Sequence, residues 1–450
     1  MAWQRLSGAD ALALNTETPT TPAHYVVLIV MEASEAVSHQ RLHELAGSSL
    51  PRLAHFRSRL FGKPLGLGQP VWAEVSDFDP SRQLYKLALP PPGGTREFAD
   101  IVAKLSTRPL ARHKPLWQAW SIEGLARGRW ALALKVSQAM FDGADGLATI
   151  LARLVTIGPD DDPTSYLPPE PSLGRSPSLV DLFTDTATEL SGAPFAGARL
   201  AGGAVPALLR SAVNTMRGDN EHRTMPVPRT VFNDALTRGR EVAFSQLRRA
   251  DIDAVADALD VGADDVFLAA CTLSLRTWLQ RHAEVPEHPL AMRFLSSSTP
   301  ARVRLPVQHD DPVSILRECQ AQRRCENHSD ISAVAQLMPP TLLHAGMQAY
   351  TRLGLSGRVR PVAHGVAATI NGPPLPVYCA GAPVVAIHAL PPLTEGAGLS
   401  ISEVMHDQAG CVTVCACPDR VAGVEEIADG IVYGLTQLRA KRKKRSRRRP

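Results

Sequence analysis

One short segment places polar side chains where a predicted strand gives way to a predicted helix, a position at which loops often carry chemistry. It runs Ser137-Gln138-Ala139-Met140-Phe141-Asp142-Gly143. Gln138 can orient a hydroxyl group, but its amide has no basic nitrogen that could take the hydroxyl proton. Taken alone, the segment is more typical of a structural turn, because Asp-Gly commonly follows a strand.

A serine nucleophile at Ser137 is poorly supported by its neighbourhood. No histidine is adjacent to it in the chain, and the glycines of a nucleophile elbow are missing. His24, His364 and His388 lie on or beside predicted strands, where a histidine is more often structural than basic. Whether one of them approaches Gln138 depends on the fold.

The elements around this turn alternate between strand and helix. Tyr25–Glu32 is an apolar, β-branched run typical of a buried strand, and Trp130–Gln138 alternates between two faces. Arg96–Thr107 has helical periodicity, and so does the segment after Gly143. The turn is therefore expected to be held by a sheet and a helix.

The second part of the chain repeats this mixture. Helices are predicted near 246–259 and over Asp264–Gln280, the latter apolar on nearly all sides, with strands at 366–371, 384–390, 399–405 and 411–417. A final helix has a face that consists of Val424, Ile427, Ile431, Leu435 and Leu438. We expect an α/β protein with mixed sheets in two domains, 1–157 and 236–440, joined by a Pro/Gly-rich crossover with connecting helices over 158–235.

Charge is distributed unevenly along the 450 residues. The formal net charge is +4, but the last ten residues carry eight cations and no anion, so residues 1–440 are net negative. We expect this basic tail, 441–450, to be disordered. Anionic lipid, nucleic acid or no partner at all are the three alternatives for it. Its cations are Lys441, Arg442, Lys443, Lys444, Arg445, Arg447, Arg448 and Arg449.

Composition excludes several classes of protein. With 44% hydrophobic and 20% charged residues, the chain is neither disordered nor fibrous. No apolar run approaches the roughly 20 residues of a membrane span, and the N-terminus lacks the pattern of a signal peptide. The seven cysteines form no CxxC pair or zinc-finger spacing. These features predict a cytoplasmic protein that needs no metal.

Several motifs in fixed order point to a family. LSGADALALNTETPTTPAHYVVLIVME, RLFGKPLGLGQPVWAEVSDFDP and LSTRPLARHKPLWQAWSIEGL precede LALKVSQAMFDGADG. GADDVFLAACTLSLRTWL and ATINGPPLPVYCAGAPVV follow later. Together they resemble the bacterial wax ester synthase/diacylglycerol acyltransferase family, from about Leu6 to Leu438.

The resemblance implies a fold and a mechanism. The family is similar to chloramphenicol acetyltransferase and to condensation domains, with two related halves around a central substrate tunnel. Acyl-CoA enters one side as co-substrate, with no other cofactor, and the acceptor alcohol enters the other. The second histidine of a His-His-x-x-x-Asp-Gly motif takes the hydroxyl proton, a task that suits the imidazole pKa.

This sequence departs from the family where the chemistry takes place. Ser137 and Gln138 occupy the two histidine positions, whereas Asp142 and Gly143 are retained. In the family, the aspartate pairs with an arginine at the position of Ser298 here, and Arg302 is the candidate substitute.

Other family positions are kept or changed by one residue. Pro115-Leu116-Trp117 matches a motif that shapes the acceptor side of the tunnel, although a tryptophan at a strand start is commonly just a core residue. Asp264-Asp265 stands where the family has Asn-Asp.

Two functions follow. The first is acyl transfer from long-chain acyl-CoA to diacylglycerol or a fatty alcohol, which yields triacylglycerol or wax ester. The second is a catalytically inactive protein that binds acyl-CoA or lipid at a membrane or lipid-inclusion surface. In either case the family favours an anionic membrane as the partner of the basic tail, at the inner membrane or at lipid inclusions, and no nucleic acid is expected.

Overall fold

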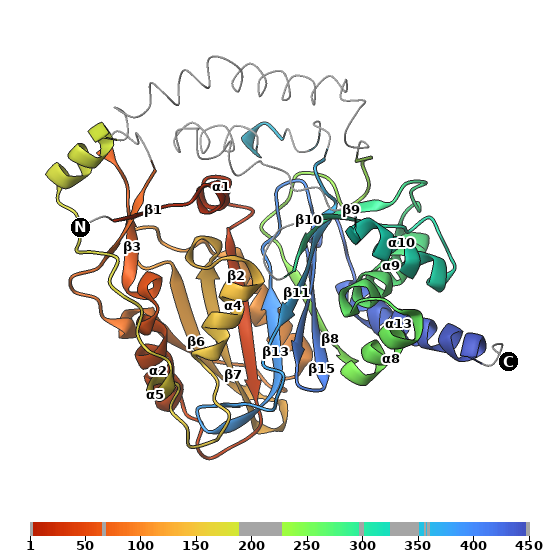
Figure 1. Ribbon diagram of the computed structural model, residues 1–450, viewed down its shortest axis with the longest axis horizontal. Helices are drawn as coiled ribbons and strands as arrows, with labels where there is room; N and C mark the ends of the chain where they lie inside the picture. Colours follow the sequence, from red (N-terminus) through yellow and green to blue (C-terminus); the bar gives the residue numbers. More distant parts are fainter. Residues whose placement is uncertain are drawn as a thin grey trace.

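Two six-stranded sheets form the centre of the molecule and lie side by side in the computed structural model (Figure 1). The structure describes residues 3–64, 69–188, 227–296, 301–324, 351–354, 357 and 361–446. The first sheet has the order β12-β13-β2-β7-β6-β5, and the second has the order β10-β9-β11-β14-β15-β8. A small sheet, β1-β4-β3, lies beside the first. The predicted α/β class with mixed sheets is confirmed.

The first half agrees with the predicted elements. Successive side chains of β2 point to opposite faces of the sheet, so Tyr25 and Val27 belong to one core cluster and Val26 and Leu28 to another. The elements are β1 (Gln4–Arg5), α1 (Gly8–Asn15), β2 (His24–Met31), α2 (His39–Ser49), β3 (Ser58–Phe61), β4 (Val71–Glu74), β5 (Leu84–Ala88), α3 (Thr95–Thr107), β6 (Trp117–Leu125), β7 (Arg129–Ser137) and α4 (Gly143–Ala152).

The second half covers one face of its sheet with helices α8, α9, α10 and α13 (Figure 1). Helix α9 is buried along most of its length, as its apolar composition predicts. The expected helix near 246–259 is only partly right, because 246–248 belong to a strand. The elements are β8 (Glu241–Arg248), α8 (Arg249–Leu259), α9 (Ala263–His282), β9 (Leu290–Leu295), β10 (Ala301–Leu305), α10 (Pro312–Arg324), β11 (Gly365–Asn371), β14 (Leu399–His406), β15 (Ala409–Ala416) and α13 (Val424–Ser446).

One segment of the second half belongs to the sheet of the first. Strands β12 (Tyr378–Cys379) and β13 (Ala382–Leu390) extend the first sheet, with β13 antiparallel to β2. The contiguous division that we expected, 1–157 and 236–440, therefore misplaces 378–390. Sequence periodicity shows that a strand exists but not which sheet it joins. Because β13 also packs against β14 and β15, it forms the seam between the halves.

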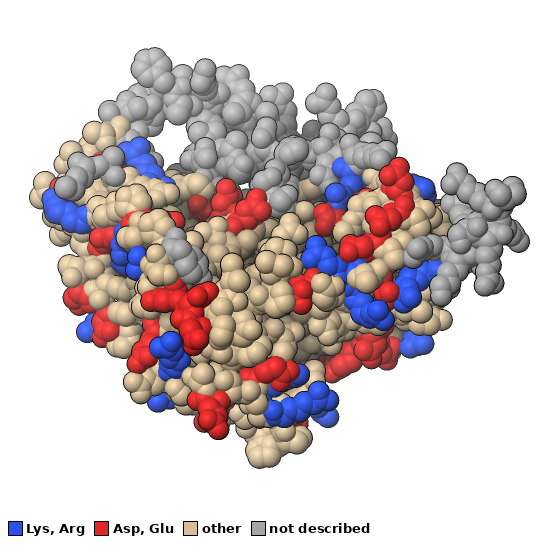
Figure 2. All heavy atoms as spheres, turned by 60° about the horizontal axis from the view of Figure 1, so that its bottom comes forward, with Lys and Arg blue, Asp and Glu red and all other residues tan. Residues whose placement is uncertain are grey.

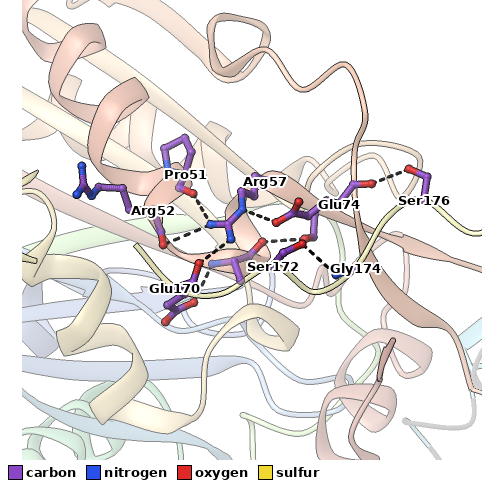
Figure 3. A network of polar contacts seen from close by, with 10 residues as sticks. Pro51, Arg52, Arg57, Glu74, Glu170, Ser172, Gly174 and Ser176 are labelled. Carbon is purple, nitrogen blue, oxygen red and sulfur yellow. Dashed lines mark hydrogen bonds and ion pairs between the residues drawn. The ribbon is translucent and has the colours of Figure 1, made fainter. Parts of the chain in front are cut away.

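Hydrogen bonds of Arg57 connect the crossover segment, at Glu170, to the first half (Figure 3). Its guanidinium donates to the Glu74 carboxylate at 2.6 Å, to the Glu170 carbonyl at 2.7 Å and to the Pro51 carbonyl at 2.9 Å. The backbone N–H of Glu74 in turn donates to the Gly174 carbonyl at 3.0 Å. Of the expected connecting helices in 158–235, α5 (Pro163–Tyr166) is a single turn, and 189–226 lie outside the described residues.

Helix α13 runs further than expected. Its predicted apolar face is buried against α9, and the helix continues to Ser446, six residues into the basic tail that we expected to be disordered. Residues 447–450 lie outside the described residues. The face that packs into the core consists of Val424, Ile427, Ile431, Leu435 and Leu438.

A carboxyl group is buried in the second sheet. Glu403 on β14 is 4% exposed, and its Oε1 atom has no hydrogen-bond partner within the described part of the chain. Burial raises the pKa of Glu403 to about 8, and the nearby charge of Asp264 acts in the same direction. The side chain is therefore neutral in the folded protein at pH 7.

We expect Glu403→Gln to remove a pH dependence of stability. Between the normal glutamate pKa and about 8 the folded state holds a proton that the unfolded state has lost, so wild-type stability falls as pH rises. The slope is at most about 1.4 kcal/mol per pH unit. Urea unfolding from pH 5 to pH 8.5 measures it, with the exposed Glu284→Gln as control. An unchanged slope in Glu403→Gln contradicts the burial argument.

Candidate functional site

The turn predicted from sequence is fixed on both sides by backbone hydrogen bonds. Ser137 is the last residue of β7, and Gln138 starts a short 3₁₀ turn that leads to α4. The N–H of Gln138 donates to the Ala23 carbonyl at 3.1 Å, and the N–H of Ser137 donates to the Leu116 carbonyl at 3.0 Å. Because both neighbouring strands hold it, the backbone at Gln138 is rigidly placed.

Pro115, Leu116 and Trp117 support this turn from the beginning of β6 and the two residues before it. All three are buried, and the Trp117 indole N–H donates to the Phe56 carbonyl at 2.7 Å. Leu116 supplies the carbonyl that accepts from Ser137. The motif thus acts as core packing beside the turn, and a role on the acceptor side stays a prediction.

Two residues that the sequence analysis did not identify, Tyr25 and Arg293, lie close to Gln138. Tyr25 on β2 is 6% exposed, and its ring contacts that of Phe141 in the turn. Burial raises the pKa of Tyr25 to about 12. The charge of Arg293 and a hydrogen-bonding interaction with the Gln138 side chain act in the opposite direction and lower it by less. The phenol is therefore neutral and can donate a hydrogen bond.

Arg293 reaches this group from the other half of the molecule. It lies on β9 opposite Val366 of β11, on the face whose Leu295 and Ile370 pack into the core cluster of Tyr25. Arg293 is partly buried and makes no hydrogen bond or ion pair with any described residue. A charged residue inside the apolar stretch LAMRFL was the available sequence signal.

His24 lies on the other side of the same strand pair. The β2–β7 register places it directly opposite Ser137. It is 3% exposed, and neither ring nitrogen forms a hydrogen bond within the described part of the chain. Burial holds the pKa of His24 well below its usual value, and the charges of Lys135 and Arg240 act in the same direction. The sheet thus supplies the neighbouring histidine that Ser137 lacks in sequence.

The other two histidines are structural, as expected. His364 Nδ1 accepts from the Ala291 N–H at 2.8 Å, and Nε2 lies 2.9 Å from the Pro228 carbonyl. His388 Nδ1 lies 3.2 Å from the Thr413 hydroxyl. Both ring nitrogens of His364 and the Nδ1 atom of His388 thus have local partners.

The expected pairing of Asp142 with Arg302 is wrong for this structure. Asp142 is exposed, and no ion pair joins these two described residues. Asp142 instead lies near Asp10, whose pKa burial raises to about 6, with a smaller contribution from the charge of Asp142. Arg302 lies on β10 opposite Arg293. Gly143 has φ +56°, a left-handed conformation that explains why glycine follows Asp142.

Asp264 and Asp265 form a different cluster at the start of α9. Arg323 of α10 binds Asp264 at 2.5 Å and Asp265 at 3.2 Å, and the Asp265 carboxylate also accepts from the Gly262 N–H. An open pocket of about 350 Å³ lies beside Asp265 and Arg323. None of these contacts involves the turn: Asp265 caps the start of α9, Asp264 binds Arg323, and a place in the substrate tunnel stays a prediction for both. Across the described ranges, no group of three or more His, Cys, Asp or Glu is placed to hold a metal ion.

Comparison with known proteins identifies relatives over nearly the whole chain. The profile "Wax ester synthase/diacylglycerol acyltransferase catalytic domain" matches residues 6–267, and the "WS/DGAT C-terminal domain" matches 301–439. Two Mycobacterium tuberculosis proteins, provisionally named diacylglycerol O-acyltransferases, are 31% and 28% identical. Each alignment covers 97% of this chain, with 90% and 96% of the respective relative.

Solved structures show the same fold. The wax ester synthase/diacylglycerol acyltransferase from Marinobacter aquaeolei VT8 aligns with a TM-score of 0.71 at 21% identity, over 98% of this chain and 100% of the other. The starter condensation domain of rhizomide synthetase aligns with a TM-score of 0.52 at 12% identity, over 98% and 95%. The expected similarity to condensation domains is thereby confirmed.

Proposed function

Because the chain belongs to the wax ester synthase/diacylglycerol acyltransferase family, we propose that it transfers a long-chain acyl group from acyl-CoA to the hydroxyl of diacylglycerol or a fatty alcohol. The observation that carries the proposal is the turn at Gln138. It keeps the strand–turn–helix arrangement of the family's reaction centre and is held by the carbonyls of Ala23 and Leu116.

The residues at the turn can supply orientation and electrostatic stabilisation. Gln138 and the neutral Tyr25 phenol offer hydrogen bonds that orient the acceptor hydroxyl. Arg293 places positive charge beside them, where negative charge develops on the thioester carbonyl oxygen during attack. The new C–O bond forms as the C–S bond breaks, and the hydroxyl proton is finally carried by the CoA thiol.

The alternative is a protein that binds acyl-CoA or lipid without turnover. It is favoured by a single observation, the absence of a basic nitrogen at Gln138. The two alternatives differ in whether the wild-type protein makes any ester at all.

Substitution of Gln138 separates these alternatives. We expect slow ester formation by the wild type, a further loss in Gln138→Ala, and a gain of about 10²-fold or more in Gln138→His, which restores a general base. The assay measures ester from long-chain acyl-CoA with diacylglycerol or fatty alcohol. Gln118→Ala on β6 is the control for amide loss elsewhere. Turnover in Gln138→His but not in the wild type would identify an inactive binding protein.

Substitution of Arg293 tests whether its positive charge stabilises the transition state of acyl transfer. We expect Arg293→Met to lower kcat by about 10-fold or more with a smaller change in KM, because the charge acts mainly on the transition state. Arg293→Lys should retain part of the rate. Arg317→Met on the surface of α10 is the matched control. A change confined to KM would instead assign Arg293 to substrate binding.

We also propose that the basic tail holds the protein at an anionic membrane or lipid-inclusion surface. The proposal is supported by the eight cations of 441–450 and by a body that is net negative. On the face shown in Figure 2, acidic and basic side chains are interspersed. Among the described residues, no helix is long and apolar enough to cross a membrane.

Neutralisation of the basic tail tests whether its cations bind the protein to an anionic surface. Replacing Lys441, Arg442, Lys443, Lys444 and Arg445 by Gln removes five charges while keeping good helix formers at the end of α13. Each cation near an anionic surface contributes about 1 kcal/mol, so binding to phosphatidylglycerol vesicles should fall at least tenfold, and wild-type binding should weaken with salt. A variant with Arg at 441, 443 and 444 should still bind. Equal binding by the Gln variant would refute the proposal.

A further inference from the structure

One face of the second sheet carries arginines and no acidic side chain among its described strand residues. The β9–β10 register places Arg302 directly opposite Arg293, and Arg304 follows two residues later on the same side of β10. Strands β11, β14, β15 and β8 continue this face in register. The acidic residues of these strands, Glu241 and Glu403, lie on the opposite face. The three arginines, called the arginine row below, therefore have no negative charge beside them in the sheet.

The arginine row begins at the reaction centre and ends at the edge of the sheet. Ile370, on the same face of β11, packs into one core cluster with α4, the helix that follows the turn at Gln138. Beyond β11 the sheet continues with β9 and then with β10, its edge strand. Arg293 is the inner member of the row, because its charge acts on Tyr25 beside the turn. Arg302 lies one strand further out.

Arg302 lacks a counter-charge within the described part of the chain. Its guanidinium forms no hydrogen bond or ion pair with the residues that the structure describes, although the side chain is partly buried. Burial lowers the pKa of Arg302, and the charge of Arg304 acts in the same direction. Like charges directly opposite each other in a strand pair also destabilise the sheet. An anion bound at Arg302 would offset both costs.

We propose that Arg302, with Arg304 beside it, binds a phosphate group of acyl-CoA while the thioester lies at Arg293 and Gln138. Coenzyme A has its phosphates at one end and its thiol at the other, joined by the pantetheine arm. A row of cations that leads from the reaction centre to the sheet edge suits this division of charge. The planar guanidinium of arginine can donate two parallel hydrogen bonds to one phosphate.

This inference rests on acyl-CoA as the donor in the proposed function and names the residues that hold its phosphates. It applies equally to a protein that transfers the acyl group and to one that binds acyl-CoA without turnover. Binding of CoA, measured without an acceptor, therefore tests it independently of ester formation.

Titration calorimetry with CoA gives the direct test. Arg302→Gln should weaken CoA binding about 10-fold or more, because hydrogen bonds to a charged phosphate are lost. Arg302→Lys should retain part of the affinity, since it keeps the charge without the fork. Arg317→Gln on the exposed surface of α10 is the matched control and should bind CoA like the wild type. Thermal unfolding of each variant is measured alongside, and Arg302→Met is the second variant if Arg302→Gln does not fold.

A substrate without phosphates gives a readout that a purely structural arginine would not produce. Acyl-pantetheine carries the same thioester as acyl-CoA but has no phosphate. In the ester-formation assay, Arg302→Gln should raise KM for acyl-CoA about 10-fold with little change in kcat, and it should leave KM for acyl-pantetheine unchanged. Equal losses with both donors assign Arg302 to structure and overturn the phosphate site.

A lipid headgroup is the other source of phosphate that the measurements distinguish. Binding to phosphatidylglycerol vesicles should be the same for Arg302→Gln and the wild type. Weaker vesicle binding together with unchanged CoA affinity assigns the arginine row to lipid and overturns the CoA assignment.

The remaining outcomes separate this inference from acyl transfer. Wild-type ester formation with unchanged CoA affinity in Arg302→Gln overturns the phosphate site and leaves acyl transfer standing. A wild type that binds CoA but makes no ester overturns acyl transfer, and a loss of CoA affinity in Arg302→Gln then still supports the phosphate site. A wild type that binds no CoA overturns both.

Discussion

The pairing of β2 with β7 is the constraint on which the site depends. Side chains alternate along a strand, so a shift of one residue in this register would exchange the two faces. The observed register puts Tyr25 on the face that meets Gln138 and Arg293, and His24 on the face that meets Ser137. The hydrogen bonds from the turn to Ala23 and Leu116 continue the same ladders.

Around this pair, the molecule has the fold of its family. Trp117 and Leu116 pack as core residues next to a turn that carries Ser137 and Gln138. Gly143 keeps the left-handed conformation that opens α4. The site that results has a neutral phenol, an amide and a guanidinium on one face of the strand pair, and a neutral imidazole with a hydroxyl on the other.

Sequence periodicity predicted most of the elements that hold the turn, because alternation and helical spacing are local properties. It could not assign β13 to the first sheet, since strand pairing is non-local, and for the same reason it did not bring His24 to Ser137 or Arg293 to Tyr25. The pairing of Asp142 with Arg302 failed because it was inferred from motif position. Asp142 faces solvent, and Arg302 lies in the other half on β10.

The pairing of β13, from the second half of the chain, with β2 of the first sheet has a mechanical consequence. Two domains joined only by linkers can swing apart on a hinge, but here β13 is hydrogen-bonded to β2 while the chain continues directly into the other sheet as β14. Separation of the halves would break that ladder between the second and third strands of a six-stranded sheet. The seam at β13 therefore holds the two halves in a fixed arrangement around the turn at Gln138.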